Sequence, residues 1–138
     1  MRIVQALPPN FDAIATVFPH VRGKPVFFAW GDRIFNPAGV VIPDEIKAHE
    51  AVHGKRQGHD VAGWWKRYLE DPVFRLAEEI PAHQAEFRHV ASLRGADDPL
   101  PGFRSRREFH RQAIALRLSS KLYGNLISLS AAKRLLSA

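Results

Sequence analysis

The sequence predicts a single α+β domain, in which a small β-hairpin or sheet is followed by an active-site helix and a mostly helical C-terminal part. Three observations predict this fold class. Strand-forming residues gather before residue 43, helix signals follow one another after it, and 138 residues are enough to bury one core. No internal repeat or low-complexity tract divides the chain, so we expect one domain over residues 1–138.

The β-structure is expected near the N-terminus. Residues 25–30 read PVFFAW and are rich in aromatic and β-branched side chains, as strands are. Gly31 and Asp32 supply a tight turn, and residues 33–36 form the returning strand. A shorter strand is expected at Arg2–Leu7.

The first helix of the C-terminal part begins near Pro43. Asp44 and Glu45 lie in its first turn, where acidic side chains suit the helix dipole, and Gly58 supplies a stop after Gln57. A second helix is predicted over Val61–Glu70.

A longer helix is expected over Pro72–Arg94. Pro81 lies inside it and should either kink the helix or mark its true start. Three further segments follow: a loop at 95–102, a basic amphipathic helix at 105–120 and a short helix at 131–136 that Ser130 caps.

Composition restricts the chemistry that the chain can perform. The sequence has no Cys, so any metal ion must be held by His, Asp or Glu. Pro8 and Pro9 interrupt the apolar residues of the N-terminus, and no run of 18 apolar residues occurs. We therefore expect neither a signal peptide nor a membrane span, and a cytoplasmic protein.

Charge is unevenly distributed along the chain. Residues 1–86 carry 10 Lys and Arg against 11 Asp and Glu, whereas residues 87–138 carry 10 against 3. The simplest interpretation of this basic C-terminal third is a solvated surface. The other is a surface that faces nucleic acid or another anionic partner.

Residues 49–53 read HEAVH and carry the clearest chemical signal. His49 and His53 are four residues apart on a predicted helix, so both imidazoles project from one face and can bind one zinc ion. Zinc lowers the pKa of a water molecule that it binds, and Glu50 is placed to accept the proton of that water as general base. The plain alternative is a pair of exposed histidines.

A catalytic zinc ion needs a third protein ligand. Glu79, His83 and Glu86 share one face of the next long helix, and Glu78 precedes them. Periodicity alone does not choose among Glu79, His83 and Glu86.

The HEAVH motif followed by Glu79 resembles the gluzincin metallopeptidases. In that family the third ligand is a Glu on a later helix, commonly three positions before a small residue, which is the relation of Glu79 to Ala82. The resemblance implies a peptidase with His49, His53 and Glu79 as zinc ligands, and it covers about residues 26–90.

The resemblance narrows to small metallopeptidase-like proteins of phages and bacterial genomes, through residues 33–37, 53–57 and 64–69. It implies a phage- or prophage-encoded protein. Many gluzincins carry an Asp where this sequence has His83, so Glu78 or Glu86 is expected to orient a ligand histidine instead.

The resemblance also implies how a substrate is held. The strand Val26–Trp30 or its hairpin partner would bind an extended peptide by backbone hydrogen bonds, and the substrate would be a peptide or protein, including a peptidoglycan peptide. Three side chains could donate a hydrogen bond to the oxyanion that forms: Tyr68, His83 and Arg88. Tyr68 could equally be a packing residue.

Two functions follow from these observations. The first is a zinc-dependent hydrolase of peptide or amide bonds. The second is a non-catalytic binding or structural protein on the same scaffold, which uses the basic surface around Arg104–Arg117 and binds nucleic acid in a salt-dependent way. The sequence has no aromatic-interleaved nucleic-acid motif, and this favours the hydrolase.

Overall fold

The computed structural model describes residues 1–137. Within these residues, a three-stranded sheet is combined with six α-helices and two 3₁₀ turns, so the predicted α+β fold class is confirmed. The elements in chain order are β1 (Arg2–Val4), α1 (Phe11–Val17), η1 (Pro19–Arg22), β2 (Phe28–Trp30), β3 (Arg33–Phe35), α2 (Asp44–Gln57), α3 (Val61–Glu70), α4 (Pro72–Ala91), α5 (Arg106–Leu118), η2 (Lys121–Tyr123) and α6 (Leu129–Ser137).

The sheet has the strand order β1-β3-β2, with β1 parallel and β2 antiparallel to the central strand β3. The hairpin turn at Gly31 and Asp32 is where we predicted it, and Gly31 has the positive φ of +60° that such a turn favours. The strands are shorter than predicted. β2 begins only at Phe28, and β1 ends at Val4.

The helices agree with the sequence signals at most of their ends. α3 has the predicted bounds, and α2 ends before Gly58, whose φ is +60°. One capping prediction is wrong: α6 begins at Leu129, and the hydroxyl group of Ser128 rather than Ser130 accepts from the amide N–H of Ala131. Both residues are serines two positions apart, so the sequence does not separate them.

Two further differences concern α1 and α4. Helix α1 was not predicted from the sequence. The long helix α4 begins at Pro72 and continues through Pro81, so Pro81 is not its start. Pro81 leaves the carbonyl group of Ala77 without its usual helical donor, and Ala77 lies on the exposed side of the helix where water can satisfy that carbonyl.

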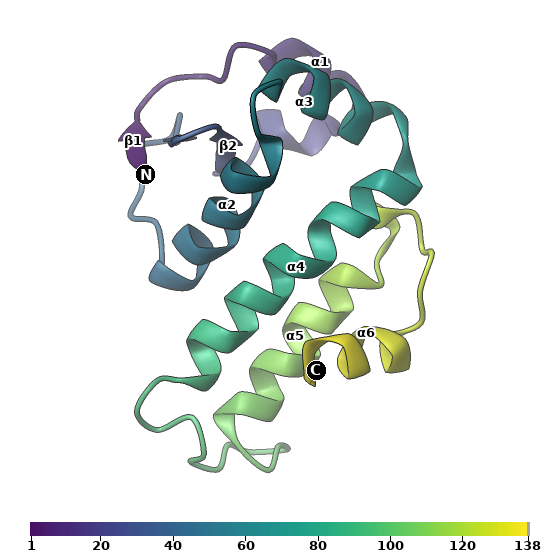
Figure 1. Cartoon of the computed structure of the whole chain (residues 1–138). Coiled ribbons are helices and arrows are strands. Elements are labelled where there is room, and N and C mark those ends of the chain that lie inside the picture. The colour runs from purple at the N-terminus through teal and green to yellow at the C-terminus, as the bar shows by residue number, and fades with distance from the viewer. Residues whose placement is uncertain (138) are drawn as a thin grey trace.

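Two hydrophobic clusters lie on opposite sides of the α2–α4 contact. Figure 1 shows the sheet, α1 and α3 at one end of the molecule and α4, α5 and α6 at the other, with α2 between them. One cluster joins α1, the hairpin and α3 around Ile14, Phe28 and Trp65. The other joins α4, α5 and α6 around Phe87, Ile114 and Leu136. The facing sides of α2 and α4 are thereby fixed against each other.

Helix α2 is also held closely against the hairpin. A Cβ atom at Gly54 would overlap the carbonyl oxygen of Gly31, so only glycine allows this approach. The side chain of Gln57 accepts from the amide N–H of Gly31 at 2.7 Å and donates to the carbonyl oxygen of Ala29 at 2.9 Å. These contacts set the position of α2 relative to β2.

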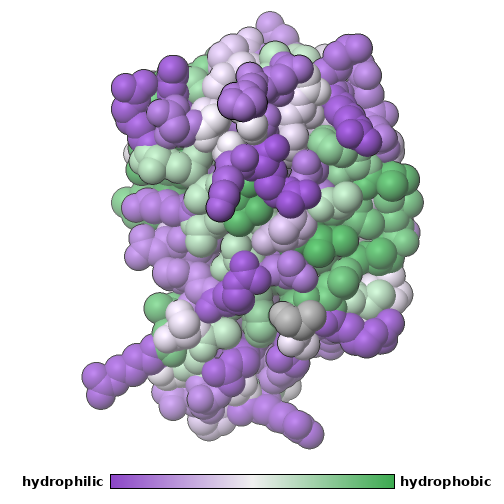
Figure 2. Space-filling model, in the orientation of Figure 1, coloured by the Kyte–Doolittle hydropathy of each residue, from purple (hydrophilic) through white to green (hydrophobic). Residues whose placement is uncertain are grey.

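The molecular surface is mixed in character. Figure 2 shows hydrophilic side chains over most of one face and an apolar patch to one side, over the segment between α5 and α6, where Leu126 is 46% exposed. Of the helices in residues 1–137, none combines the length and apolar character that crossing a membrane requires.

Candidate metal centre

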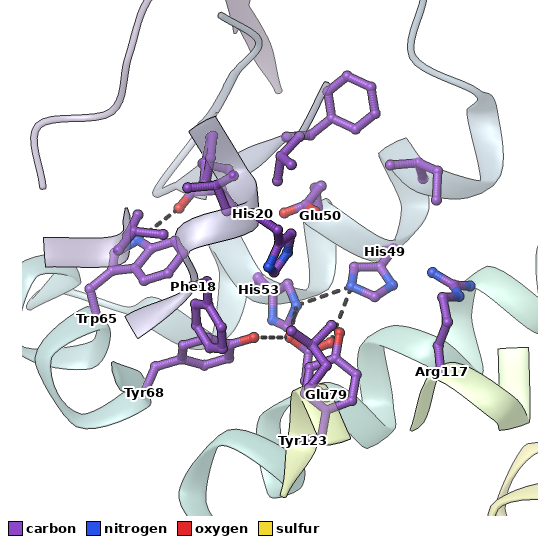
Figure 3. Close-up of a pocket in the computed structure, with 18 of the residues that line it drawn as sticks. Phe18, His20, His49, Glu50, His53, Trp65, Tyr68, Glu79, Arg117 and Tyr123 are labelled. Carbon is purple, nitrogen blue, oxygen red and sulfur yellow. Dashed lines mark hydrogen bonds and ion pairs between the residues drawn. The ribbon is translucent and has the colours of Figure 1, made fainter. Parts of the chain in front are cut away.

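The candidate site lies between α2 and α4. Helix α2 contributes His49, Glu50 and His53, and α4 contributes Glu79, whose carboxylate faces the two imidazoles (Figure 3). His49, His53 and Glu79 are each buried, with at most 7% of the residue exposed. The two helices therefore bring together the three ligands that the gluzincin resemblance implies.

The three side chains converge at distances that suit a zinc ion. His49 Nε2 lies 3.2 Å from His53 Nε2 and 3.3 Å from Glu79 Oε2, and His53 Nε2 lies 3.3 Å from Glu79 Oε1. In a tetrahedral site with bonds of about 2.0 Å, ligand atoms are roughly 3.3 Å apart. Glu79 Oε2 is buried and has no hydrogen-bond partner among the described residues, which leaves it available for a cation.

A second set of possible ligands overlaps the first. His49, Glu79 and His83 offer ligand atoms that all lie within 4.8 Å of one another. His83 is completely buried, and its Nδ1–H donates to the backbone carbonyl oxygen of Glu79 at 2.7 Å. That bond leaves Nε2 as the free nitrogen, and it has no hydrogen-bond partner among residues 1–137. The two sets therefore differ only in whether His53 or His83 is used.

The two remaining carboxylates of α4 have different partners. Glu86 Oε1 accepts a hydrogen bond from His49 Nδ1 at 3.0 Å, and the same carboxylate pairs with Arg117 of α5. Glu78 instead accepts from Trp64 Nε1 at 2.9 Å and pairs with Arg56. Of the two residues expected to orient a ligand histidine, Glu86 is the one in contact with it.

Charges within the cluster shift the pKa values of His49 and Glu79 in opposite directions. Burial alone would lower the pKa of His49, but hydrogen bonds to Glu79 and Glu86 outweigh burial and raise it from 6.5 to about 10. Burial alone would raise the pKa of Glu79, but His53, His49 and His83 hold it well below its usual value. The two carboxylates thus favour positive charge on His49, the residue between them.

Glu50 lies beside the ligand histidines and faces the same pocket. Its residue is partly exposed, and the pocket-lining residues include it together with His49, His53 and Glu79. Burial raises the pKa of Glu50, while the two histidines and a hydrogen bond from the backbone of Ala29 partly offset that rise. A carboxylate beside a metal site is a chemically suitable proton acceptor.

The pocket has a volume of about 250 Å³ and is mostly apolar in its outer walls. Phe18, Val26, Phe27, Trp65 and Leu122 contribute to these walls. The ligand set His49, His53 and Glu79 lines this pocket, whereas His83 does not. A metal ion held by the first set would therefore be accessible to a substrate in the pocket.

The structure separates the three predicted oxyanion donors. Tyr68 lines the pocket, but its hydroxyl group is hydrogen-bonded to Glu79. Tyr68 is also a packing residue, with its ring centroid 4.9 Å from that of Trp64. His83 is buried away from the pocket. Arg88 is exposed and is not among the pocket residues, so the structure does not bring it to the site: nine residues after Glu79, it lies on the opposite face of α4.

The predicted peptide-binding edge is partly closed. β2 is an edge strand, but the carbonyl oxygen of Ala29 already accepts from Gln57 and from Trp65 Nε1, at 2.9 and 3.0 Å. Phe27, two residues earlier, lines the pocket. Because backbone groups alternate along an extended chain, the backbone of Phe27 would face the same way as that of Ala29. Phe27 is therefore the position at which this edge could still pair with a peptide.

Three of the polar or charged pocket residues, His20, Arg117 and Tyr123, were not predicted to belong to the site. His20 comes from η1, Arg117 from α5 and Tyr123 from η2, and all three line the pocket with Glu50 (Figure 3). His20 and Arg117 are exposed, as isolated basic residues usually are, and Tyr123 lies in a segment without a helix or strand pattern. No spacing relates these residues to the HEAVH motif, so only the tertiary fold reveals them.

Comparison with known proteins assigns no family. The sequence has no significant match to a protein-family model or to a curated protein, and the structure has none to a solved structure. The gluzincin resemblance therefore rests on the HEAVH motif and Glu79 alone.

Proposed function

We propose that this chain is a gluzincin-like, zinc-dependent hydrolase that cleaves a peptide or amide bond. The observation that supports it is the convergence of His49, His53 and Glu79 at 3.2–3.3 Å, next to Glu50, in the wall of one pocket. A pair of exposed histidines on a solvated helix would not be buried together with Glu79 in this way.

The donor set favours zinc. Two imidazole nitrogens and one carboxylate, with no thiolate in the chain, are the ligands of many catalytic zinc sites, and the position facing the pocket would stay open for water or substrate. When bound, zinc would act as a Lewis acid and lower the pKa of a water molecule in that position.

Glu50 would move the proton in this reaction. Its carboxylate would accept the proton of the attacking water and deliver it to the leaving amine nitrogen. The backbone amide of Ala29 and the histidines on both sides of Glu50 lower its pKa and partly offset the rise that burial causes. Glu86, which is fixed by Arg117, would orient His49 through its Nδ1–H.

The substrate would be a peptide or protein, including the peptide part of peptidoglycan. Apolar walls from Phe18, Val26 and Leu122 suit an apolar side chain, and the backbone of Phe27 could pair with an extended segment. This pairing site is shorter than a whole strand edge, because Gln57 and Trp65 occupy the carbonyl group of Ala29.

A second candidate function, a non-catalytic protein with a structural metal ion, is favoured by one observation. If His83 joined His49, His53 and Glu79, four protein ligands would close the coordination sphere, as in structural zinc sites. The basic C-terminal surface would then be the working part of the molecule. Against this candidate, Glu50 faces the pocket beside the ligands, which a purely structural metal site does not need.

The Glu50→Gln variant tests the proposal. Zinc-loaded wild type and variant are incubated with a bacterial proteome digest and with purified peptidoglycan, and new termini are identified by mass spectrometry. The variant should keep its zinc and lose at least about 100-fold in cleavage rate. Glu45→Gln, on the first turn of the same helix, should cleave like wild type. Equal rates for Glu50→Gln and wild type would contradict the mechanism.

A further inference from the structure

Two polar side chains in the pocket have no partner in the proposed chemistry. Among the polar residues that line the pocket outside the ligands and Glu50, Tyr68 is bonded to Glu79 and Arg117 is paired with Glu86. The side chains of His20 and Tyr123 form no hydrogen bond with another of residues 1–137. Each could therefore donate to a group bound in the pocket.

Tyr123 is the more rigidly placed of the two. Only 7% of the residue is exposed, and it belongs to the cluster that also contains Ile114 and Leu118 of α5. Its ring meets the ring of His83 edge-on, with centroids 5.5 Å apart and an interplanar angle of 83°. His20, in contrast, is an exposed residue of the short η1 turn.

The backbone also fixes Tyr123. It is the last residue of η2, and Gly124 follows with a φ of +81°, a left-handed conformation that glycine adopts without strain. The amide N–H of Tyr123 donates to the carbonyl oxygen of Ser120 at 3.1 Å. Figure 3 shows this side chain entering the pocket from the C-terminal segment, on the side of Glu79.

The hydroxyl group of Tyr123 would remain protonated in this setting. Burial raises the pKa of Tyr123 well above its usual value, and the charges of Glu79, Glu50 and Glu86 add to that rise more than Arg117 offsets it. A phenol that keeps its proton is a hydrogen-bond donor.

We propose that the Tyr123 hydroxyl group donates a hydrogen bond to the oxygen atom on which negative charge develops during cleavage, and that Tyr123 is thus a catalytic residue. This inference rests on the proposed function. Of the predicted donors, Tyr68 is bonded to Glu79, His83 lies behind the site and Arg88 lies on the far side of α4, so Tyr123 fills a role that they leave open. The C-terminal third of the chain would then complete the active site.

Acetohydroxamate, a small anionic zinc ligand, tests this assignment without knowledge of the substrate. Its affinity for zinc-loaded wild type and Tyr123→Phe is measured by isothermal titration calorimetry. Because the variant loses one oxygen atom that would donate to a charged acceptor, its affinity should fall by about 10- to 100-fold. Zinc content should stay at about one ion per chain, since Tyr123 is not a ligand.

His20→Gln is the matched control for the competing donor. It should bind acetohydroxamate within about twofold of wild type, because His20 is expected to make no contact with the bound anion. Unchanged affinity in Tyr123→Phe, or a loss in His20→Gln instead, would overturn the assignment while leaving the proposed function in place. If zinc-loaded wild type does not bind acetohydroxamate, the open coordination position is absent, and the proposed function falls together with this inference.

Discussion

His49 Nδ1 donates a hydrogen bond to Glu86 Oε1 at 3.0 Å, although the two residues lie 37 positions apart and on different helices. In the neutral imidazole, the form that binds a metal ion, this bond fixes the tautomer of His49, so that Nε2 carries the free lone pair and faces Glu79 and His53. Arg117 holds the other oxygen of Glu86. The bond therefore connects α5 to a ligand histidine on α2 through α4.

Replacing Glu86 should weaken metal binding without removing a ligand. Glu86→Gln loses the negative charge behind His49, and we expect the affinity for zinc to fall by about 10- to 100-fold. Competition with a fluorescent zinc chelator measures this change. Glu78→Gln is the control, since Glu78 is a buried carboxylate of the same helix that contacts Trp64 and Arg56 instead. Equal losses in both variants would contradict a specific role for Glu86.

The two overlapping ligand sets can be separated by a pair of asparagine variants. His53→Asn should abolish tight zinc binding, since it removes the Nε2 atom that lies 3.2 Å from His49 Nε2. His83→Asn keeps a donor near the position of Nδ1, where His83 bonds the carbonyl group of Glu79, and its affinity should stay within about tenfold of wild type. The reverse order of the two affinities, measured by the same competition, would assign the site to His49, Glu79 and His83.

The metal-free protein should lose stability at alkaline pH. The pKa of His49 is raised in the folded state from 6.5 to about 10, so its proton stabilises the fold fully below pH 6.5. That contribution is lost as the pH rises from 6.5 through about 10. We expect the Tm of metal-free protein to fall across this window, and the Tm of the zinc-loaded protein to fall less, because zinc replaces the proton. Parallel curves for the two forms, measured by differential scanning fluorimetry, would contradict this coupling.

Gly54→Ala should destabilise the protein even though alanine favours helices. Helix propensity alone predicts a gain of about 1 kcal/mol in the free energy of unfolding. The added methyl group, however, would overlap the carbonyl oxygen of Gly31, and overpacking of this kind costs about 1–3 kcal/mol. Chemical denaturation should therefore show no gain and at most a loss of about 2 kcal/mol. Gly23→Ala is the control, because its nearest neighbouring atom is 4.0 Å away. A full propensity gain in Gly54→Ala would mean that α2 does not pack this closely.

Local signals predicted much of the fold. The turn at Gly31 and Asp32, the start of α2 and its end before Gly58 follow from residues close in sequence, and the structure confirms them. Pro81 was misleading because its effect depends on the exposure of Ala77 one turn earlier, which no local pattern records. Ser128 and Ser130 were likewise indistinguishable as caps, because both are serines close to the start of α6 and no local pattern shows which hydroxyl group accepts the hydrogen bond.

The sequence predicted the site residues that are related by spacing along the chain, but not those that only tertiary packing brings to the site. The spacing of His49 and His53 placed both on one face of α2, and the family pattern singled out Glu79, which the fold brings to within 3.3 Å of them. Periodicity placed Glu86 on the same face of α4 as Glu79, but it could not predict the hydrogen bond between Glu86 and His49. Tyr123 and His20 reach the pocket only through the packing of η2 and η1, so neither carries a signal in the sequence.

The central claim is that His49, His53 and Glu79 hold one zinc ion. The most direct test is the zinc content of purified wild type and His49→Ala after gentle dialysis, measured by elemental analysis, with the exposed His59→Ala as control. We predict about one zinc ion per chain in wild type and His59→Ala, and none in His49→Ala. Absence of zinc from the wild type, together with no uptake of added zinc, would contradict the claim, as would equal zinc in His49→Ala.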